Sequence, residues 1–126
     1  MPKLISRYGI TRGDTLLISR RLTDNEDNVL NVNPATDAIN FTIRKNMDSE
    51  VLLHKDLTNG IVLRNDGIFD ITILPKDTES MGFGTYGFDI EVTIGKEEDT
   101  PFVRTVNSGT IELLEDDYSR PEKEGV

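Results

Sequence analysis

The stretch that decides the fold covers residues 82–94 and reads GFGTYGFDIEVTI. From Tyr86 to Ile94, apolar side chains occupy every second position, and polar residues or glycine fill the positions between them. A β-strand points successive side chains to opposite faces, so this period places the apolar residues on one face and the polar ones on the other. Glycines before and after the alternation favour turns at both ends. The sequence therefore predicts a long strand with one buried face.

Shorter segments repeat this alternation and are expected to pair with the long strand. The clearest are residues 39–45 and 68–74, in which isoleucine and phenylalanine alternate with polar residues. Residues 15–22 alternate as well, except that Arg20 interrupts the apolar face near its end, which suits a strand at the rim of a sheet. Six residues on the apolar faces of these strands are predicted to be buried in the core: Phe41, Ile71, Tyr86, Phe88, Ile90 and Val92.

Turn and helix signals complete the expected order of elements. Residues 65–67, Asn-Asp-Gly, strongly indicate a hairpin. Residues 75–81 begin with proline and contain early acids, as expected for a short helical crossing. Residues 107–109, Asn-Ser-Gly, predict a turn that divides residues 102–114 into two short strands. Residues 51–57 fit either a strand or a helical turn, because their period alone does not decide.

The whole pattern predicts an all-β fold. It contains about seven to nine short strands with turn signals about every 8–12 residues, which is typical of an immunoglobulin-like antiparallel β-sandwich. The cysteine pair and the tryptophan of antibody domains are absent, so only the architecture is expected to correspond. We expect the sandwich over residues 10–116, with an arm or first short strand at residues 1–9 and an acidic tail at residues 117–126.

Length and composition limit the class of protein. A chain of 126 residues can bury roughly two-thirds of its unfolded surface as one domain, without a disulfide or a metal. It contains no cysteine and no run of about 18 apolar residues, so neither a disulfide framework nor a membrane span is expected. Residues 1–10 also lack the apolar run of a signal peptide, which predicts synthesis in the cytoplasm.

The net charge of −9 is unevenly distributed along the chain. Residues 1–63 are neutral overall, whereas residues 64–126 carry fifteen acids against six Lys and Arg. Nucleic-acid binding requires concentrated positive charge, so this balance argues against nucleic acid as a partner. A solvated acidic surface that maintains solubility is the simplest explanation of the excess.

Few residues are available for catalysis or metal binding. His54 is the sole histidine; without cysteine or a second histidine, we expect no catalytic triad, no Cys–His pair and no zinc site, and a surface or rim position for His54. Two acidic clusters offer oxygen ligands for calcium: Asp24, Glu26 and Asp27 form one, and Glu97, Glu98 and Asp99 form the other. Neither matches the calcium-binding loop with its glycine and closing glutamate. We predict no catalytic residue, no cofactor and no metal site.

Arg12-Gly13-Asp14 matches an integrin-binding tripeptide, but a glycine between charges is also an ordinary way into a strand. Three-residue matches are common by chance, so we expect a structural turn at this position. Paired carboxylates for glycoside hydrolysis would need two elements and a saccharide cleft, which composition neither shows nor excludes. The sequence therefore gives no support for catalysis.

Two parts of the chain together resemble a known family. TRGDT at residues 11–15 runs into a strand, and DGIFDITILPKDTESMGFGTYGFDIEVTIG at residues 66–95 leads toward NSGTIELLEDD. This order is similar to the immunoglobulin-like N-terminal domain of phage baseplate upper proteins and related tail components. In that family an RGDT-like start precedes the first long strand, and a strand, a short helix and a GxYxYDI module follow. GTYGFDI at residues 84–90 occupies the place of that module, with Phe88 where a second tyrosine is usual.

The resemblance spans about residues 10–117 and implies a non-catalytic structural protein of a phage virion, assembled on a baseplate or tail through repeated protein–protein contacts. Its expected partners are other phage structural proteins and copies of itself, without nucleic acid or membrane insertion. Its expected location is the virion, after synthesis in the host cytoplasm. Proteins of that family are generally longer, so a role as a tail adaptor or as a capsid decoration protein is also consistent with the resemblance.

A module that binds host-surface carbohydrate is the alternative from a different functional class. It calls for exposed aromatic rings, and Tyr8, Tyr118 and Phe83 are the aromatic residues outside the strongly patterned strands.

The charges at the two ends of the chain bear on assembly. Residues 3–21 are rich in Lys and Arg, and residues 112–124 are rich in Asp and Glu. Either both ends are solvated, or one end docks on an open sheet edge of a neighbour with complementary charge. In the second case, removal of residues 1–9 or of residues 117–126 is expected to leave folding intact and to weaken assembly.

Overall fold

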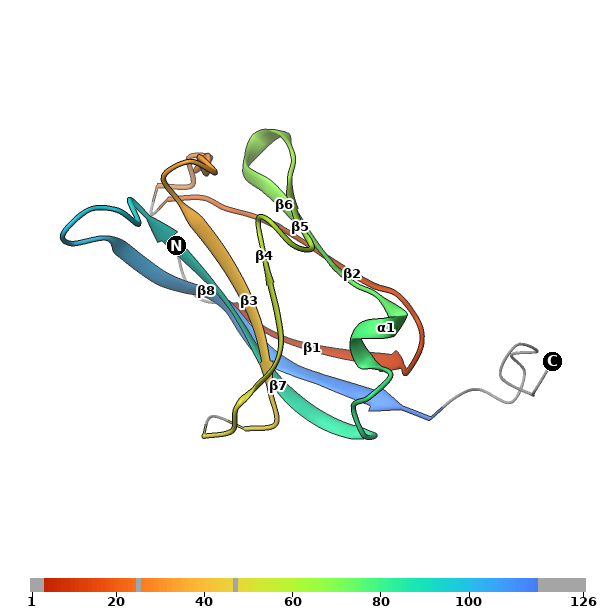
Figure 1. Cartoon of the computed structure of the whole chain (residues 1–126). Coiled ribbons are helices and arrows are strands. Elements are labelled where there is room, and N and C mark those ends of the chain that lie inside the picture. Colours follow the sequence, from red (N-terminus) through yellow and green to blue (C-terminus); the bar gives the residue numbers. More distant parts are fainter. Residues whose placement is uncertain (1–3, 25, 47, 116–126) are drawn as a thin grey trace.

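The computed structural model describes residues 4–24, 26–46 and 48–115, and Figure 1 shows the path of the chain. The elements of this part are β1 (Leu4–Thr11), β2 (Leu16–Arg21), β3 (Ala38–Arg44), β4 (Val51–Asp56), β5 (Ile61–Leu63), the 3-10 turn η1 (Asn65–Gly67), β6 (Ile68–Ile73), α1 (Pro75–Thr78), β7 (Gly84–Ile94) and β8 (Phe102–Leu114). The predicted all-β fold with one short helix is confirmed. The predicted acidic tail at residues 117–126 lies outside the described residues.

The strands form two sheets that face each other across the core (Figure 1). The larger sheet has the order β1-β8-β7-β3-β4, and the smaller has the order β2-β6-β5. The strands β2, β6 and β5 correspond to strands B, E and D of an immunoglobulin domain, and β3, β7 and β8 correspond to strands C, F and G. Neighbouring strands are antiparallel except β1 and β8, which run parallel. The molecule is an immunoglobulin-like β-sandwich with one parallel pair at an edge.

The strand β7 lies in the middle of the larger sheet and confirms the strand predicted at residues 82–94, although it begins at Gly84. It pairs with β3 on one side and with β8 on the other. Its side chains alternate between the core and the outer face, as the sequence pattern predicts. All six residues predicted for the core are buried, with exposed fractions between 0% and 6%: Phe41, Ile71, Tyr86, Phe88, Ile90 and Val92.

Tyr86 forms a tyrosine corner at the start of β7. Its hydroxyl donates to the carbonyl oxygen of Gly82 at 2.6 Å, and immunoglobulin-like domains use the same kind of bond where strand F begins. Two residues later, at the place of the second antibody cysteine, Phe88 packs against Phe41 of β3 with ring centroids 5.7 Å apart. An aromatic pair therefore occupies the centre of this sandwich, where antibody domains have a disulfide and a tryptophan.

The helical crossing predicted at residues 75–81 is present as α1, which begins with Pro75. The carboxylate of Asp77 accepts a hydrogen bond from the backbone N–H of Leu74 at 2.7 Å, and this bond caps the helix. The same carboxylate lies 2.8 Å from Nζ of Lys55, whose side chain points inward from β4 and is only 5% exposed. A buried ammonium group is stable only with such a partner. The ion pair therefore ties the edge of the larger sheet to the connection between β6 and β7.

A second polar network joins the two sheets near β1. Arg20 of β2 donates from Nε to Oδ1 of Asn107 at 3.2 Å, and its Nη2 donates to the hydroxyls of Ser6 and Tyr8. Asn107 is fully buried and donates from its side-chain amide to Oγ of Ser6 at 3.1 Å. Arg20, which interrupts the apolar face of its strand in the sequence, therefore forms hydrogen bonds that join the two sheets. Its strand β2 lies at the edge of the smaller sheet, as the sequence indicates.

The prediction of a turn at residues 107–109 is wrong. The strand β8 runs without interruption from Phe102 to Leu114, and a bulge opposite Ile90 and Glu91 takes up one extra residue. Gly109 is required for another reason: β1 passes so closely that an added Cβ would lie 1.7 Å from the carbonyl oxygen of Ser6. The glycine therefore permits the close approach of two parallel strands, and it does not form a turn.

The segment from Leu4 to Thr11 is a strand paired with β8 along its whole length. Removal of residues 1–9 would therefore delete most of a strand from the larger sheet. The truncation is therefore expected to impair folding, and a loss of assembly in that variant would not show that these residues contact a neighbour.

Replacing Phe88 with Ala is expected to lower the free energy of unfolding by about 3–5 kcal/mol, because it leaves a cavity against Phe41. Urea denaturation measures the loss. Thr85→Ala, on the solvent-facing side of the same strand, is the control and is expected to change stability by less than about 0.5 kcal/mol. An unchanged denaturation midpoint for Phe88→Ala would contradict the assigned register of β7.

Asp77→Ala is expected to cost about 3–5 kcal/mol, because it leaves the ammonium of Lys55 buried without a partner and also removes the cap of α1. Lys55→Met is expected to cost less, because Asp77 keeps its hydrogen bond from Leu74. The double variant contains no unpaired buried charge and should recover part of the loss. Urea denaturation of the three variants gives the coupling energy, and simple additivity would show that the two residues do not stabilise each other.

Candidate functional site

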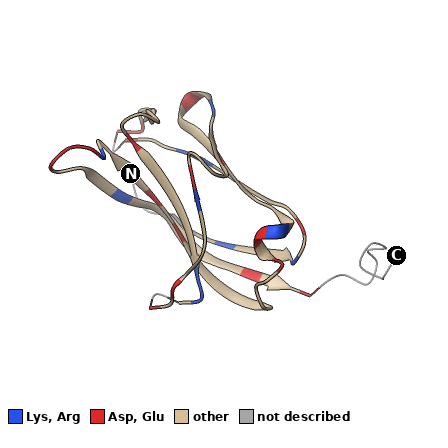
Figure 2. Ribbon diagram, in the orientation of Figure 1, with Lys and Arg blue, Asp and Glu red and all other residues tan. Residues whose placement is uncertain are grey.

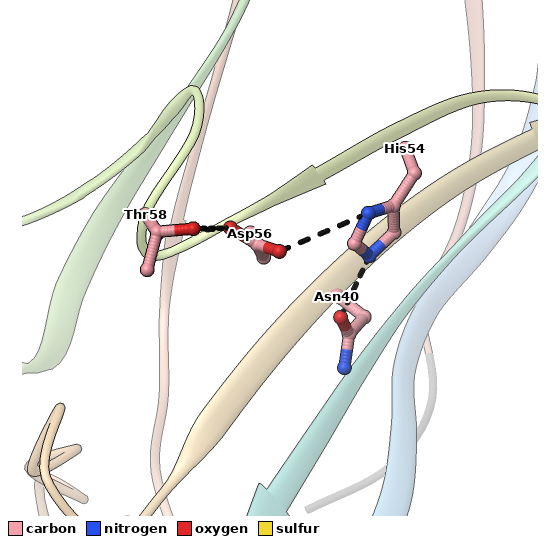
Figure 3. Close-up of polar contacts among 4 residues, drawn as sticks. All are labelled: Asn40, His54, Asp56 and Thr58. Carbon is pink, nitrogen blue, oxygen red and sulfur yellow. Dashed lines mark hydrogen bonds and ion pairs between the residues drawn. The ribbon is translucent and has the colours of Figure 1, made fainter.

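His54 lies on the outward face of β4 in a chain of four polar side chains (Figure 3). Its Nε2 lies 2.8 Å from Oδ1 of Asn40 on β3, and this oxygen only accepts, so Nε2 is the donor. Its Nδ1 lies 3.8 Å from Oδ2 of Asp56. The other oxygen of Asp56 accepts from the hydroxyl of Thr58 at 2.6 Å. The His54 side chain is 42% exposed, which confirms the surface position predicted from the sequence.

These four residues do not form an arrangement that activates a nucleophile. A catalytic triad requires a hydroxyl or thiol bonded to the histidine, and here the ring nitrogens face Asn40 and Asp56. In Figure 3 the Thr58 hydroxyl points to Asp56, which lies between it and the imidazole ring. Asp56 also accepts the backbone N–H of Thr58 at 2.9 Å. The cluster therefore closes the turn after β4 and connects that edge strand to β3.

The first acidic cluster is organised by its own backbone. Oδ1 of Asp24 accepts the backbone N–H of Glu26 at 2.8 Å and that of Asn28 at 3.0 Å. These bonds favour the ionised carboxyl, so the pKa of Asp24 lies below its ordinary value of 3.8. The carboxylate that the sequence offers to calcium is thus already engaged in shaping the loop.

The second acidic cluster, residues 97–99, lies in the turn between β7 and β8, and Figure 2 shows acidic residues along the tip of that hairpin. Among residues 4–24, 26–46 and 48–115, no group of three or more His, Cys, Asp or Glu is placed to hold a metal ion. The absence of a metal site in the whole protein stays a prediction.

The Arg-Gly-Asp tripeptide forms the turn from β1 to β2. The backbone N–H of Asp14 donates to the carbonyl oxygen of Thr11 at 3.0 Å, and Gly13 has a φ of 95°, which favours glycine. Arg12 donates to the carbonyl oxygen of Met81 at 3.2 Å, and its guanidinium lies 4.3 Å from the ring centroid of Phe83. The arginine is engaged within the domain, in agreement with a structural turn.

An apolar hollow opens beneath the β7–β8 hairpin, where the larger sheet extends beyond the smaller one. The strands β7 and β8 have 11 and 13 residues, whereas β2 of the facing sheet has 6. The hollow has a volume of about 230 Å³, and its apolar lining consists of Leu22, Leu30, Val92, Ile94, Phe102 and Val106. Phe102 and the adjacent Val103 are each 52% exposed. Apolar side chains therefore reach solvent at this end of the sandwich.

The sequence pattern alone does not indicate this hollow. Residues 84–94 and 102–106 are both predicted to be strands, and the predicted core residues Tyr86, Phe88, Ile90 and Val92 all lie in the first of them. The available signal was length, because residues 15–22 offer a facing strand too short to cover the whole hairpin. The hollow lies between the β7–β8 hairpin and the segment that follows β2, which contributes Leu22 and Leu30 to the lining.

Comparison with known proteins adds no relative: no family model matches this chain, and no curated protein matches it in a sequence search. The likeness to phage baseplate proteins therefore depends on the sequence motifs alone. In the part of the chain that the structure describes, no helix is long and apolar enough to cross a membrane.

Asp56 is expected to make stability depend on pH. The Thr58 hydroxyl is the main cause of its low pKa, and partial burial works in the opposite direction. Because the folded pKa lies below the ordinary 3.8, the stabilisation is complete above that value and is lost as the pH falls through the folded pKa. Thr58→Val should raise the pKa of Asp56 toward 3.8, measured by NMR titration of its carboxyl carbon.

Asp56→Asn should also show a weaker loss of stability on acidification than the wild type, measured by urea denaturation at a series of pH values. A wild-type Asp56 carboxyl that titrates at 3.8 or above would contradict both expectations.

Proposed function

We propose that this protein is a non-catalytic structural component of a phage particle, an immunoglobulin-like sandwich that contacts other virion proteins in a baseplate or tail. The motif order behind the resemblance corresponds to a continuous part of the fold, from β6 through α1 to β7. The GTYGFDI module supplies Tyr86 of the tyrosine corner and Phe88 of the central ring pair. These correspondences support the resemblance at the positions where it is most specific.

The main observation that supports the proposal is the apolar surface at the end of the sandwich formed by the β7–β8 hairpin. Phe102 lines the hollow beneath the β7–β8 hairpin, is 52% exposed and is not part of the buried core of the domain. Single apolar side chains are common on surfaces, but a hollow beside an exposed aromatic ring is typical of protein contact sites. Asp24 and Arg104 line the hollow, and the guanidinium of Arg104 lies 5.1 Å from the ring centroid of Phe102. Residues 97–99 add acids in the hairpin turn, so acids outnumber bases around the hollow. The surface fits a partner protein that presents an apolar side chain beside basic residues.

A carbohydrate-binding module is the second candidate, and the outer face of the larger sheet favours it. A hollow of about 580 Å³ crosses this face, and its lining includes Thr42, Arg44, Asp89, Ser108 and Thr110. Hydroxyl, guanidinium and carboxylate groups can hydrogen-bond to sugar hydroxyls. Binding of the purified protein to a glycan array, abolished by Asp89→Ala, would favour this function over the first.

A virion protein is expected to co-purify with phage particles in a fixed number of copies. Quantitative mass spectrometry of gradient-purified particles that carry an epitope-tagged chain measures this number. Phe102→Asp places a charge in the apolar contact and should reduce incorporation at least about tenfold, the equivalent of about 1.4 kcal/mol.

Val62→Asp is the matched control, because Val62 is 61% exposed on β5 and does not line the hollow. This variant should enter particles at the wild-type level. Particles that lack the tagged wild-type chain would refute the proposed function. Equal incorporation of Phe102→Asp and wild type would show that another surface makes the contact.

A further inference from the structure

The outer strands of the two sheets are protected from further pairing to different degrees. Proteins guard such edges with very short strands or with charged side chains that point inward. The strand β5 has only three residues, β4 carries the inward Lys55, and β2 carries Arg20, which points to the facing sheet. The strand β1 has eight residues, and its inward side chains from Ser6 to Ile10 include no charge. Among the described strands, β1 is therefore the least protected edge.

The backbone of β1 presents hydrogen-bonding groups to this edge. The N–H of Arg12 donates to the carbonyl oxygen of Leu114 at 3.1 Å, and β1 pairs with β8 without a register shift. Successive N–H groups of a strand point to opposite sides, so those of Arg7, Gly9 and Thr11 point away from β8. A further strand can pair with these groups.

The outer face beside this edge contains a hollow with charges of both signs. It has a volume of about 500 Å³, and Arg7, Gly9 and Glu112 are among its lining residues. Gly9 lies opposite Glu112 in the β1–β8 pair, and all three residues are exposed. Within the described residues, the side chains of Arg7 and Glu112 form no hydrogen bond or ion pair with each other or with other groups.

We propose that β1 pairs antiparallel with β1 of a second copy of this chain, about a two-fold axis at Tyr8, so that the two larger sheets become continuous. In this register Arg7 lies opposite Gly9 of the partner. Because Gly9 has no side chain, Arg7 can cross it and reach the partner's Glu112 on the next strand, about 10 Å or two strand spacings away. The symmetry repeats this Arg7–Glu112 pair on the other side of the axis.

Charge selects this register from the alternatives. In a two-fold antiparallel pair of β1 strands, the residue on the axis lies opposite the same residue of the second copy. An axis at Arg7 would place the Arg7 side chains of the two copies, which have like charges, opposite each other. A centre at Gly9 would place Arg7 opposite Thr11, which lies next to Leu114 on β8. The centre at Tyr8 is the one that brings Arg7 beside a carboxylate. The edge is thus self-complementary, which favours a second copy over an unrelated strand.

Sedimentation velocity of the purified chain over a range of concentrations tests the pairing. The wild type should shift from monomer to dimer, whereas Arg7→Glu and Glu112→Arg should each weaken the dimer at least about tenfold, because each places like charges together at both ends. An equimolar mixture of the two variants restores both opposite-charge pairs. It should therefore form a heterodimer more tightly than either variant forms a dimer by itself.

Gly9→Leu provides a second test that does not change charge. An added Cβ at Gly9 meets only Cδ1 of Leu114, at the ordinary contact distance of 3.8 Å, so the fold should tolerate the substitution. The larger side chain blocks the path of the partner's Arg7. This variant should keep the wild-type melting temperature and lose the dimer.

Lys76→Glu and Glu79→Arg are the matched charge controls, because both positions are exposed and lie in or beside α1. Both variants should dimerise like the wild type. A monomeric wild type, a mixture that does not associate, or a dimer unaffected by changes at Arg7, Gly9 and Glu112 would overturn the proposal. The pairing does not depend on the proposed virion function, which particle co-purification tests separately.

Discussion

The alternation of side chains along β7 is the constraint on which the rest of the structure depends. This strand is hydrogen-bonded to β3 and to β8, and its inner face contributes Tyr86, Phe88, Ile90 and Val92 to the core. A slip of one residue would turn Asp89 and Glu91 inward and would expose the apolar face. Burial of two unpaired carboxylates is too costly for any rearrangement of neighbours to offset. The register of β7 therefore determines that of β3 and β8, and through β8 that of β1.

Two polar contacts flank the apolar centre and join the sheets on opposite sides. The Lys55–Asp77 pair ties β4 to α1, and the Arg20–Asn107 hydrogen bond ties β2 to β8. A buried ion pair is weak evidence for stability, because the cost of removing charges from water offsets much of the attraction. Its clearer effect is on specificity. An inward charge near the edge of a sheet disfavours pairing with another chain, and β4 and β2 both carry one.

The unequal lengths of the two sheets determine where the surface is suited to contacts. The hairpin of β7 and β8 extends past β2, so apolar side chains that would be internal in a matched sandwich line an open hollow. The edge of β1 lies on different residues from this hollow. The proposed pairing of β1 and a contact at the hollow therefore use different residues, so one copy of the chain could make both contacts at the same time.

Local sequence determined the positions of the strands and the choice of their buried faces. Residues 84–94 and 38–44 show a two-residue period, and a proline begins α1. Each of these signals acts within a few residues, so it can be recognised in the sequence before the fold is known. The identity of the six core residues follows from the same period. The tyrosine corner was not predicted, although Gly82 and Tyr86 are only four residues apart, because its meaning depends on the fold around it.

Tertiary structure alone decided the features that involve distant partners. Asn-Ser-Gly at residues 107–109 favours a turn locally, but Asn107 bonds to Arg20 and Gly109 admits the backbone of Ser6, about a hundred residues earlier. The hollow beneath the hairpin depends on the length of a strand in the opposite sheet, and the open edge of β1 depends on which strand ends the larger sheet. The alternation of apolar and polar residues is a property of each strand by itself. Which strands it pairs with, which residues cover it and whether it lies at an edge are determined only when the two sheets form and pack.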